Sequence, residues 1–378
     1  MMTTGPVEIS PRVLRALGTG ITHQSRPEFI RLYDQLLTDL RAIWKTRNDM
    51  VILHGEGIVG VEAAIASFVE PGQKVIIASA GVFGFWFQKL VESHQGIPVI
   101  VGANSRTDTR IEDVKKALDE NPDAVLLIAV HVETVSGISN RIDLICAEAK
   151  KRGIPTAVDA ISSIAGQDFR TDEWQVDICI GTGQHCLSSP PGLTPVSVSN
   201  FAWNKMLEKK KPLRDSYLSL LDMKETWTKG KYLPYTPLIS EVYAMSESCR
   251  EILEEGLDAV FRRHHLVGEM ARRGIEAMNL ELYSMRRESA ADTVTTALLP
   301  ETIQDTQLIE SVLSHHGILI GGGYRELKGR IFRIGHSGYS STPSNVIATL
   351  AAIEIELRRL GHQCATGNSV HSAISVLE

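Results

Sequence analysis

The sequence has few cysteines and no long apolar run. Its five cysteines are an odd number at unrelated spacings, which predicts free thiols and excludes both a disulfide framework and the paired ligands of a zinc site. No stretch is long and apolar enough to cross a bilayer, and the N-terminus has no apolar signal region. We therefore expect a cytoplasmic protein that inserts into no membrane.

Charge of one sign is also scarce in any single stretch. Lysine and arginine together number 39 and aspartate and glutamate 45, which gives a formal net charge of −6. The longest basic run, Lys209 to Lys211, is typical of a solvated surface segment. We therefore expect neither nucleic acid nor a membrane as a partner. With 378 residues, the chain is long enough for one large core and a smaller domain.

Short β-branched runs alternate along the chain with segments that have apolar residues at helical spacing. Continuous apolar runs of this length are typical of strands buried in a largely parallel sheet, and the helical segments supply the crossovers. The pattern predicts an α/β fold. The expected strands are 74–78, 98–101, 124–130, 156–159 and 176–180, and the expected helices between them are 61–68, 110–118 and 141–151.

The chain also divides along its length. The segment 209–237 is polar, contains proline and has no clear strand pattern, and a helical stretch at 242–253 follows it. A second region with its own helices and strands comes next. We expect an N-terminal arm over residues 1–20, a large domain over 21–255 and a small C-terminal α/β domain over 256–378.

Asp159 ends one of the expected strands, in the run Val158 to Ser163. Ligands of open α/β folds usually bind at the carboxyl ends of the strands. A carboxylate there can hold the nitrogen of a pyridine ring protonated, which turns the ring into an electron sink. The same residue fits a helix N-cap or a turn, so the local pattern leaves both interpretations open.

The run Gly181 to Leu193 resembles the cofactor segment of class-V aminotransferases, fold type I enzymes that depend on pyridoxal 5'-phosphate (PLP). In that family a lysine that binds the cofactor covalently occupies the position of His185. Gln184 matches a glutamine that contacts the cofactor phosphate, and Asp159 matches the aspartate at the pyridine nitrogen. The resemblance covers essentially the whole chain. It implies a large domain with a mostly parallel seven-stranded sheet, a smaller C-terminal domain and aminotransferase activity.

A glycine-bearing turn, His54 to Val59, opens the helix expected at 61–68. Free amides at a helix start can bind an anion, and the resemblance places Glu56, Gly57 and Ile58 at the cofactor. Relatives carry small or hydroxyl residues here, whereas a carboxylate would repel a phosphate by on the order of a kcal/mol. This favours an unphosphorylated ligand and resembles the pyridoxamine–pyruvate branch of the family, beside the alanine–glyoxylate (serine–pyruvate) branch. Alternatively, Glu56 is an exposed turn residue.

Further matches complete the site that the resemblance implies. Phe83 falls at the aromatic residue that stacks on the pyridine ring and Thr134 at the hydroxyl that contacts the ring oxygen, although each also fits a core or turn role. Arg333 falls at the arginine that binds the substrate carboxylate with two parallel donors; alone, it would suggest a surface ion pair. Arg325 is a second, weaker candidate, because in the pyridoxamine-using branch the second substrate arginine aligns with Tyr324 instead.

The resemblance also implies a homodimer with shared active sites. Tyr235 and Thr236 fall in a loop that reaches the cofactor of the neighbouring subunit. Gly5 and Val7 lie in the opening segment, where the resemblance implies substrate binding.

Histidine in place of lysine changes what the site can do. Imidazole cannot form the covalent link, so we expect PLP, or free pyridoxal or pyridoxamine, to bind non-covalently. Imidazole can act as a general base near neutral pH, since its ordinary pKa is about 6.5. We expect an aminotransferase that acts between a B6 vitamer and a small 2-oxo acid such as pyruvate or glyoxylate, with its activity impaired or altered by His185. The alternatives are a lyase or dehydratase with pyridoxamine phosphate and His185 as base, and a non-catalytic B6-binding protein.

Overall fold

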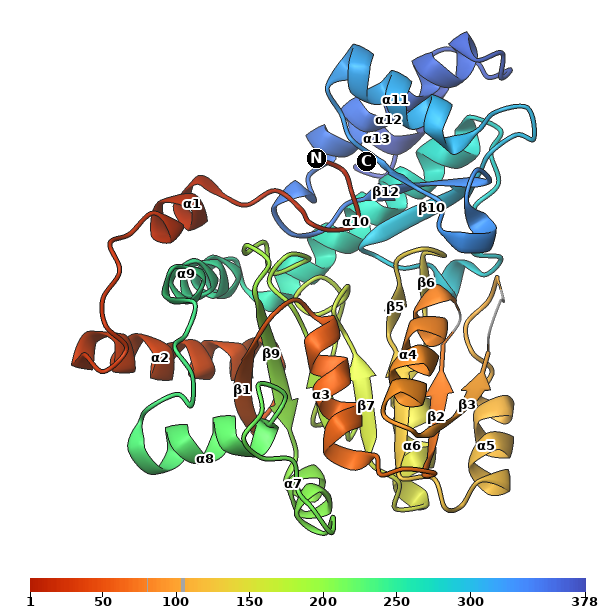
Figure 1. Cartoon of the computed structure of the whole chain (residues 1–378). Helices are drawn as coiled ribbons and strands as arrows, with labels where there is room; N and C mark the ends of the chain where they lie inside the picture. Colours follow the sequence, from red (N-terminus) through yellow and green to blue (C-terminus); the bar gives the residue numbers. More distant parts are fainter. Residues whose placement is uncertain (80, 103–105) are drawn as a thin grey trace.

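The computed structural model describes residues 1–79, 81–102 and 106–378, and a seven-stranded sheet lies at its centre (Figure 1). The strand order is β1-β9-β8-β7-β4-β2-β3. β9 pairs antiparallel with β1 and with β8, and the other adjacent pairs are parallel. The strands are β1 (Asp49–His54), β2 (Lys74–Ala78), β3 (Ile97–Val101), β4 (Leu126–Val130), β7 (Thr156–Asp159), β8 (Ile178–Ile180) and β9 (Leu193–Val198).

Helices cover both faces of this sheet. Successive strand residues point to opposite faces. Val75 therefore packs into one core with α3, α4 and α7, while Ile76 packs into another with α2, α5 and α6. The helices are α1 (Pro11–Leu17), α2 (Pro27–Ile43), α3 (Ile58–Phe68), α4 (Val82–Ser93), α5 (Ile111–Glu120), α6 (Ile142–Lys151), α7 (Asn200–Leu207), α8 (Leu220–Gly230) and α9 (Ile239–Glu255).

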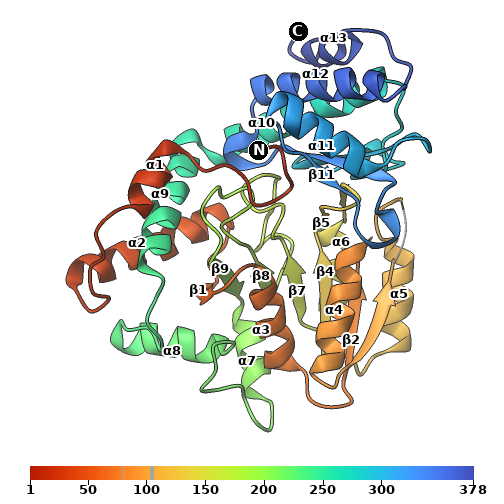
Figure 2. The same ribbon diagram turned by 45° about the horizontal axis from the view of Figure 1, so that its top comes forward.

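A smaller sheet lies above the carboxyl edge of the large one (Figures 1 and 2). It pairs β10 with β12 and β12 with β11, all antiparallel. A separate apolar core joins it to the C-terminal helices. The elements are α10 (Leu257–Ala277), β10 (Val294–Leu298), α11 (Asp305–His316), β11 (Gly321–Gly322), β12 (Ile331–Gly335), α12 (Pro343–Arg359) and α13 (Asn368–Ile374). Gly256, between α9 and α10, is where we propose the boundary between the large and small domains.

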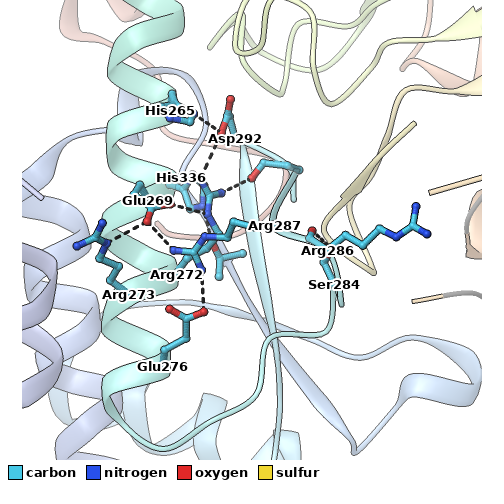
Figure 3. Close-up of polar contacts among 12 residues, drawn as sticks. His265, Glu269, Arg272, Arg273, Glu276, Ser284, Arg286, Arg287, Asp292 and His336 are labelled. Atoms are coloured by element: carbon cyan, nitrogen blue, oxygen red, sulfur yellow. Dashed lines mark hydrogen bonds and ion pairs between the residues drawn. The ribbon is translucent and has the colours of Figure 1, made fainter. Parts of the chain in front are cut away.

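An ion-pair network ties α10 to the segment that precedes β10 (Figure 3). Arg272 is only 4% exposed, and its guanidinium reaches Glu269 at 3.3 Å, Asp292 at 3.4 Å and the Ala291 carbonyl at 2.8 Å. Arg287 adds a second cation against Glu269. The same segment also contacts the large domain: Thr293 Oγ1 donates a hydrogen bond to the Ser162 carbonyl at 2.9 Å. The network therefore holds in place the segment before β10, which contacts the large domain.

The predicted α/β fold is confirmed, and the expected strands 74–78 and 156–159 match β2 and β7. None of the sequence patterns above predicts β1, β9 or α8. Pro195 lies inside β9 and lacks an amide donor, which argues against a central strand, yet its carbonyl accepts from Gly181 at 3.0 Å. α8 lies in the polar segment 209–237, where Ser219 caps it by accepting from Asp222 N–H. No described helix is both long and apolar enough to span a membrane.

Candidate active site

A cavity of about 360 Å³ lies between the carboxyl edge of the large sheet and the small sheet. Ligands of open α/β folds usually bind at this edge. Several strands end here. β7 ends at Asp159, and the loop after β8 carries His185. Thr134 lies in the turn between two short strands that follow β4, β5 (Val132–Glu133) and β6 (Ile138–Ser139). The cavity collects these predicted site residues: Gly5, Glu56, Ile58, Phe83, Thr134, Asp159, Gln184, His185 and Arg333.

Asp159 is a buried acid at the end of β7. It is 5% exposed, and its Oδ1 accepts a hydrogen bond from the Ile161 amide at 2.9 Å. Burial raises the pKa of Asp159 to about 7; the Ile161 bond opposes this rise and the charge of Glu56 adds to it. Asp159 thus both accepts a bond in the turn after β7 and lines the cavity. A cationic group in the cavity would bring the carboxylate back to its charged form.

His185 lies in the turn after β8, with a half-buried ring. Its Nδ1 is buried and has no hydrogen-bond partner within the described chain. Burial lowers the pKa of His185 to about 4, against the opposing effect of a hydrogen bond with the Thr4 backbone. The imidazole is therefore neutral at pH 7 and keeps a free lone pair for a proton.

Glu56 and Gln184 form the polar end of the cavity, next to the start of α3. Gln184 Nε2 donates to Glu56 Oε2 at 3.3 Å, and Thr182 Oγ1 donates to Gln184 Oε1. Glu56 itself is exposed, as the alternative turn interpretation expects, but it also lines the cavity. A negative charge therefore stands beside the helix start at which an anion would otherwise bind.

An aromatic wall closes one side of the cavity. Phe83 and Trp86 meet edge to face with ring centroids 5.4 Å apart, and Trp86 meets Tyr324 in the same way at 5.5 Å. The buried carboxyl of Glu133 lies beneath the first turn of α4 and accepts from the Ser79 hydroxyl. Burial raises the pKa of Glu133 to about 7. The Phe83 amide donates to Glu133 Oε2 at 3.5 Å, so this carboxyl anchors the first turn of α4.

Arg333 enters the cavity from β12, the central strand of the small sheet. Its guanidinium donates to the Gly322 carbonyl at 2.7 Å, and to Thr4 Oγ1 and the Thr134 carbonyl at 3.2 Å each. No carboxylate in the described ranges forms an ion pair with it. Burial lowers the pKa of Arg333 to about 10, so it stays charged at neutral pH. A cation that is largely buried and lacks a counter-ion favours an anionic ligand.

The other predicted site residues lie outside this cavity. Arg325 stacks on Phe85, with its guanidinium carbon 3.6 Å from the ring centroid, and lines a neighbouring cavity of about 300 Å³. Tyr235 stacks on Tyr217 at 4.0 Å between centroids, and Thr236 is exposed. Val7 is buried and Gly57 packs under the side chain of Ile161. The roles predicted for these residues stay predictions.

Trp86, Tyr324 and Thr4 also line the cavity, and none of them is among the predicted site residues. Trp86 lies three residues after Phe83 in a helix, and this spacing places both side chains on one face. The sequence could therefore have identified Trp86 as a lining residue. Tyr324 and Thr4 come from segments without periodicity, and only tertiary structure brings them to the cavity. Among the described residues, no cluster of histidine, cysteine and acidic side chains has the arrangement of a metal site.

Comparisons with known proteins agree with this fold. The family model described as aminotransferase class-V matches residues 15–328. The chain is 32% identical to the pyridoxamine–pyruvate transaminase of Mesorhizobium japonicum, over 100% of this chain and 96% of that protein. It is 28% identical to the (S)-ureidoglycine–glyoxylate transaminase of Bacillus subtilis, over 100% and 95% respectively.

Solved structures show the same likeness. The crystal structure of pyridoxamine–pyruvate aminotransferase from Mesorhizobium loti superposes with a TM-score of 0.95 at 31% identity, and the match covers 100% of this chain and 96% of that chain. The chain belongs to the class-V aminotransferase family. The family depends on vitamin B6, so the predicted fold type and cofactor class are both confirmed.

The lining of the cavity fits a B6 vitamer. No lysine is among the described residues that line it. Asp159 would meet the pyridine nitrogen, Phe83 the ring face and Thr134 the ring oxygen. Among the described residues, Nδ1 of His185 has no hydrogen-bond partner, and the guanidinium of Arg333 donates three hydrogen bonds but has no counter-ion.

Proposed function

We propose that this chain is an aminotransferase that moves an amino group between a non-covalently bound B6 vitamer and a small 2-oxo acid such as pyruvate or glyoxylate. The observation that carries the proposal is the unpaired guanidinium of Arg333, which faces the same cavity as Asp159 and His185. A relative named for its use of pyridoxamine and pyruvate supports it. The acid would bind through its carboxylate, with the reacting carbon towards His185.

The bound B6 ring supplies an electron sink for the bond that breaks at the substrate carbon. Asp159 would hold the ring nitrogen protonated, and Phe83 would fix the ring plane. His185 is neutral at pH 7, so its imidazole would accept the proton from the carbon on one side of the transfer and return it on the other.

The charges of the cavity favour a monocarboxylic acid. Arg333 is the sole lysine or arginine among the described lining residues, while Glu56 and Asp159 are both acidic. A second carboxylate on the substrate would find no cation and would face two like charges. We therefore propose that oxaloacetate and 2-oxoglutarate are poor substrates.

The alternative reaction has a specific observation in its favour. A histidine in place of the usual primary amine, with no described lysine in the cavity, would suit a lyase or dehydratase that keeps its cofactor in the amine form. His185 would then act as the native base.

We also propose that the protein is a homodimer in which Tyr235 and Thr236 reach the neighbouring site. The exposed rings of Tyr217 and Tyr232, at 55% and 56%, support this. The expected cytoplasmic location stays a prediction.

The test is amino transfer from pyridoxamine to pyruvate by the purified protein. Formation of pyridoxal, followed by absorbance, and of alanine, followed by chromatography, should rise together in equal amounts. Arg333→Leu should abolish the formation of alanine from pyruvate. Arg325→Leu, which lies outside the cavity, should leave alanine formation unchanged. Alanine formation that is unaffected by Arg333→Leu would contradict the proposal. Pyridoxamine-dependent elimination without alanine would favour the lyase or dehydratase.

A further inference from the structure

The segment Met2 to Val7 fastens the two parts of the molecule together at the cavity. At one end, Met2 N–H donates to the Leu319 carbonyl and Gly335 N–H donates to the Met2 carbonyl, both at 2.8 Å. At the other end, Val7 N–H donates to the carbonyl of Gln184 at 3.1 Å. In Figures 1 and 2 this segment starts beside the small sheet and then runs to α1 on the large domain. Both of its ends are thus held by backbone bonds.

Between these anchors, two adjacent residues touch the two reactive groups of the cavity. Thr4 Oγ1 accepts a hydrogen bond from Arg333 Nη1 at 3.2 Å. Gly5 lies against the imidazole of His185: a Cβ on Gly5 would lie 2.5 Å from the ring Cε1 and 2.7 Å from Nε2. The φ of Gly5 is +154°, which side chains rarely adopt. Glycine is therefore required here both by the backbone and by the ring that it faces.

We propose that Thr4 and Gly5 are positioning residues that hold the anion-binding Arg333 and the proton-carrying His185 in fixed relation to each other. Thr4 orients the guanidinium, and the bare Gly5 backbone sets the face on which the imidazole lies. The functional meaning of these contacts rests on the proposed function, but the contacts themselves are testable without turnover. A displacement of either group by about 1 Å is enough to lower a reaction rate by orders of magnitude.

The Thr4 contact is tested by binding of pyruvate to the full chain with pyridoxal bound, a pair that has no amino group to exchange, measured by calorimetry. Thr4→Val removes the hydroxyl acceptor and keeps the shape, so the dissociation constant should rise about tenfold, the usual effect of losing a hydrogen bond to a charged group. Thr4→Ser keeps the acceptor and should restore wild-type affinity. Equal affinity of the valine and serine variants, or tighter binding by the valine variant, would overturn this role of Thr4.

The Gly5 contact is tested by a double-mutant cycle with His185. Gly5→Ala should lower the melting temperature more in the wild-type background than in His185→Ala, because removing the ring removes the clash and leaves only the backbone strain. Gly20→Ala is the matched control, since nothing lies within 4 Å of its Cβ position. An equal loss in both backgrounds would overturn the contact. If Gly5→Ala folds only in His185→Ala, the proposal is supported.

A kinetic split separates positioning from a merely structural role. Gly5→Ala should lower kcat for amino transfer by about tenfold or more with little change in KM for pyruvate, because it displaces the proton carrier. Thr4→Val should mainly raise KM. Parallel loss in both parameters for both variants would overturn the proposal. If the wild type shows no turnover, the proposed function fails, while the binding series and the thermal cycle still decide the role of the segment.

Discussion

Glu56 and Asp159 are two carboxylates that line one cavity, and the charge of Glu56 adds to burial in raising the pKa of Asp159 to about 7. Like charges that share a site disfavour ionisation of the more buried partner. A ligand that brings a positive ring nitrogen to Asp159 relieves this repulsion. A ligand that brings a phosphate to the Glu56 end increases it. The two carboxylates thus favour an unphosphorylated vitamer over its phosphate ester.

We predict that the protein binds free pyridoxal and pyridoxamine more tightly than their phosphate esters. Glu56 stands where phosphate would approach the start of α3, and the repulsion is worth on the order of 1 kcal/mol when partly screened by solvent. Glu56→Gln should therefore shift the preference towards the ester by about fivefold to tenfold. Titration calorimetry with the free and phosphorylated vitamers measures both dissociation constants.

Glu62→Gln is the matched control, because Glu62 lies on the same helix but does not line the cavity. It removes the same charge and should leave the preference unchanged. Clearly tighter binding of PLP by the wild type would refute the prediction, and would assign Gln184 and the α3 amides to the phosphate instead.

We also predict that no covalent link forms between the wild-type protein and a B6 aldehyde. An imidazole at position 185 cannot replace a primary amine, and no described lysine lines the cavity. After treatment with pyridoxal and borohydride, intact mass should show no added cofactor. His185→Lys should add one cofactor mass and should raise amino transfer by orders of magnitude, because the covalent step and the proton transfer are both restored.

His185→Gln serves as the control for this variant, since it removes the base without supplying an amine. It should gain no mass and should lose the residual activity. A stable adduct on the wild type, mapped to any lysine, would disprove the prediction. A lysine variant that gains the adduct but no activity would favour the lyase or dehydratase.

The elements that position the site could be predicted where local pattern alone decides them. β2 and β7 are short runs with apolar residues at their centres, and both are buried in the sheet, as is typical of central parallel strands. β9 could not be predicted because Pro195 breaks the local rule, and the sheet tolerates it only because the proline carbonyl still accepts from Gly181. That compensation is tertiary, so no window of sequence contains it.

The candidate site shows the same division. Asp159, His185 and Arg333 each stand in a short motif, and the resemblance of these motifs to one family is enough to group them in one site. The contact between Gly5 and His185 joins positions 180 residues apart, and the sequence shows only a glycine before a proline. The lack of a carboxylate partner for Arg333 among the described residues likewise cannot be read from the sequence, because it depends on which carboxylates fold near the guanidinium.

We predict that Asp159→Asn stabilises the ligand-free protein above neutral pH while it weakens vitamer binding. The pKa of Asp159 is raised from its ordinary 3.8 to about 7, so ionisation costs folding free energy. This cost is absent below pH 3.8, grows between pH 3.8 and 7 and is complete above 7. The asparagine variant should gain on the order of 2 kcal/mol at pH 8 and nothing near pH 4.

Thermal unfolding of the ligand-free proteins across this pH range checks the prediction. Asp123→Asn is the contrasting control: the hydrogen bond from Lys74 lowers the pKa of exposed Asp123, so its removal should not stabilise the protein at any pH. Equal stability of Asp159→Asn and wild type at pH 8 would mean that the carboxyl is not desolvated. Undiminished affinity for pyridoxamine would remove Asp159 from the ring nitrogen.

The network around α10 in Figure 3 should make stability depend on acid in the opposite sense. Burial pushes the pKa of Glu269 up, but hydrogen bonds from Arg287 and Arg273 outweigh it and lower the pKa to about 2. A carboxyl whose pKa is lowered in the folded state stabilises the fold fully above its ordinary pKa of 4.5 and loses this contribution as the pH falls towards 2.

Glu269→Gln should therefore lower the free energy of unfolding by about 1 kcal/mol at pH 7, after discounting for solvent screening, and by progressively less below pH 4.5. Urea unfolding at several pH values measures the difference. Glu276→Gln is the control, because Glu276 on the same helix forms an ion pair with Arg287 and with no other described residue. A deficit in Glu269→Gln that stays constant down to pH 3, or a deficit as large in Glu276→Gln, would show that the network contributes packing and not charge pairing.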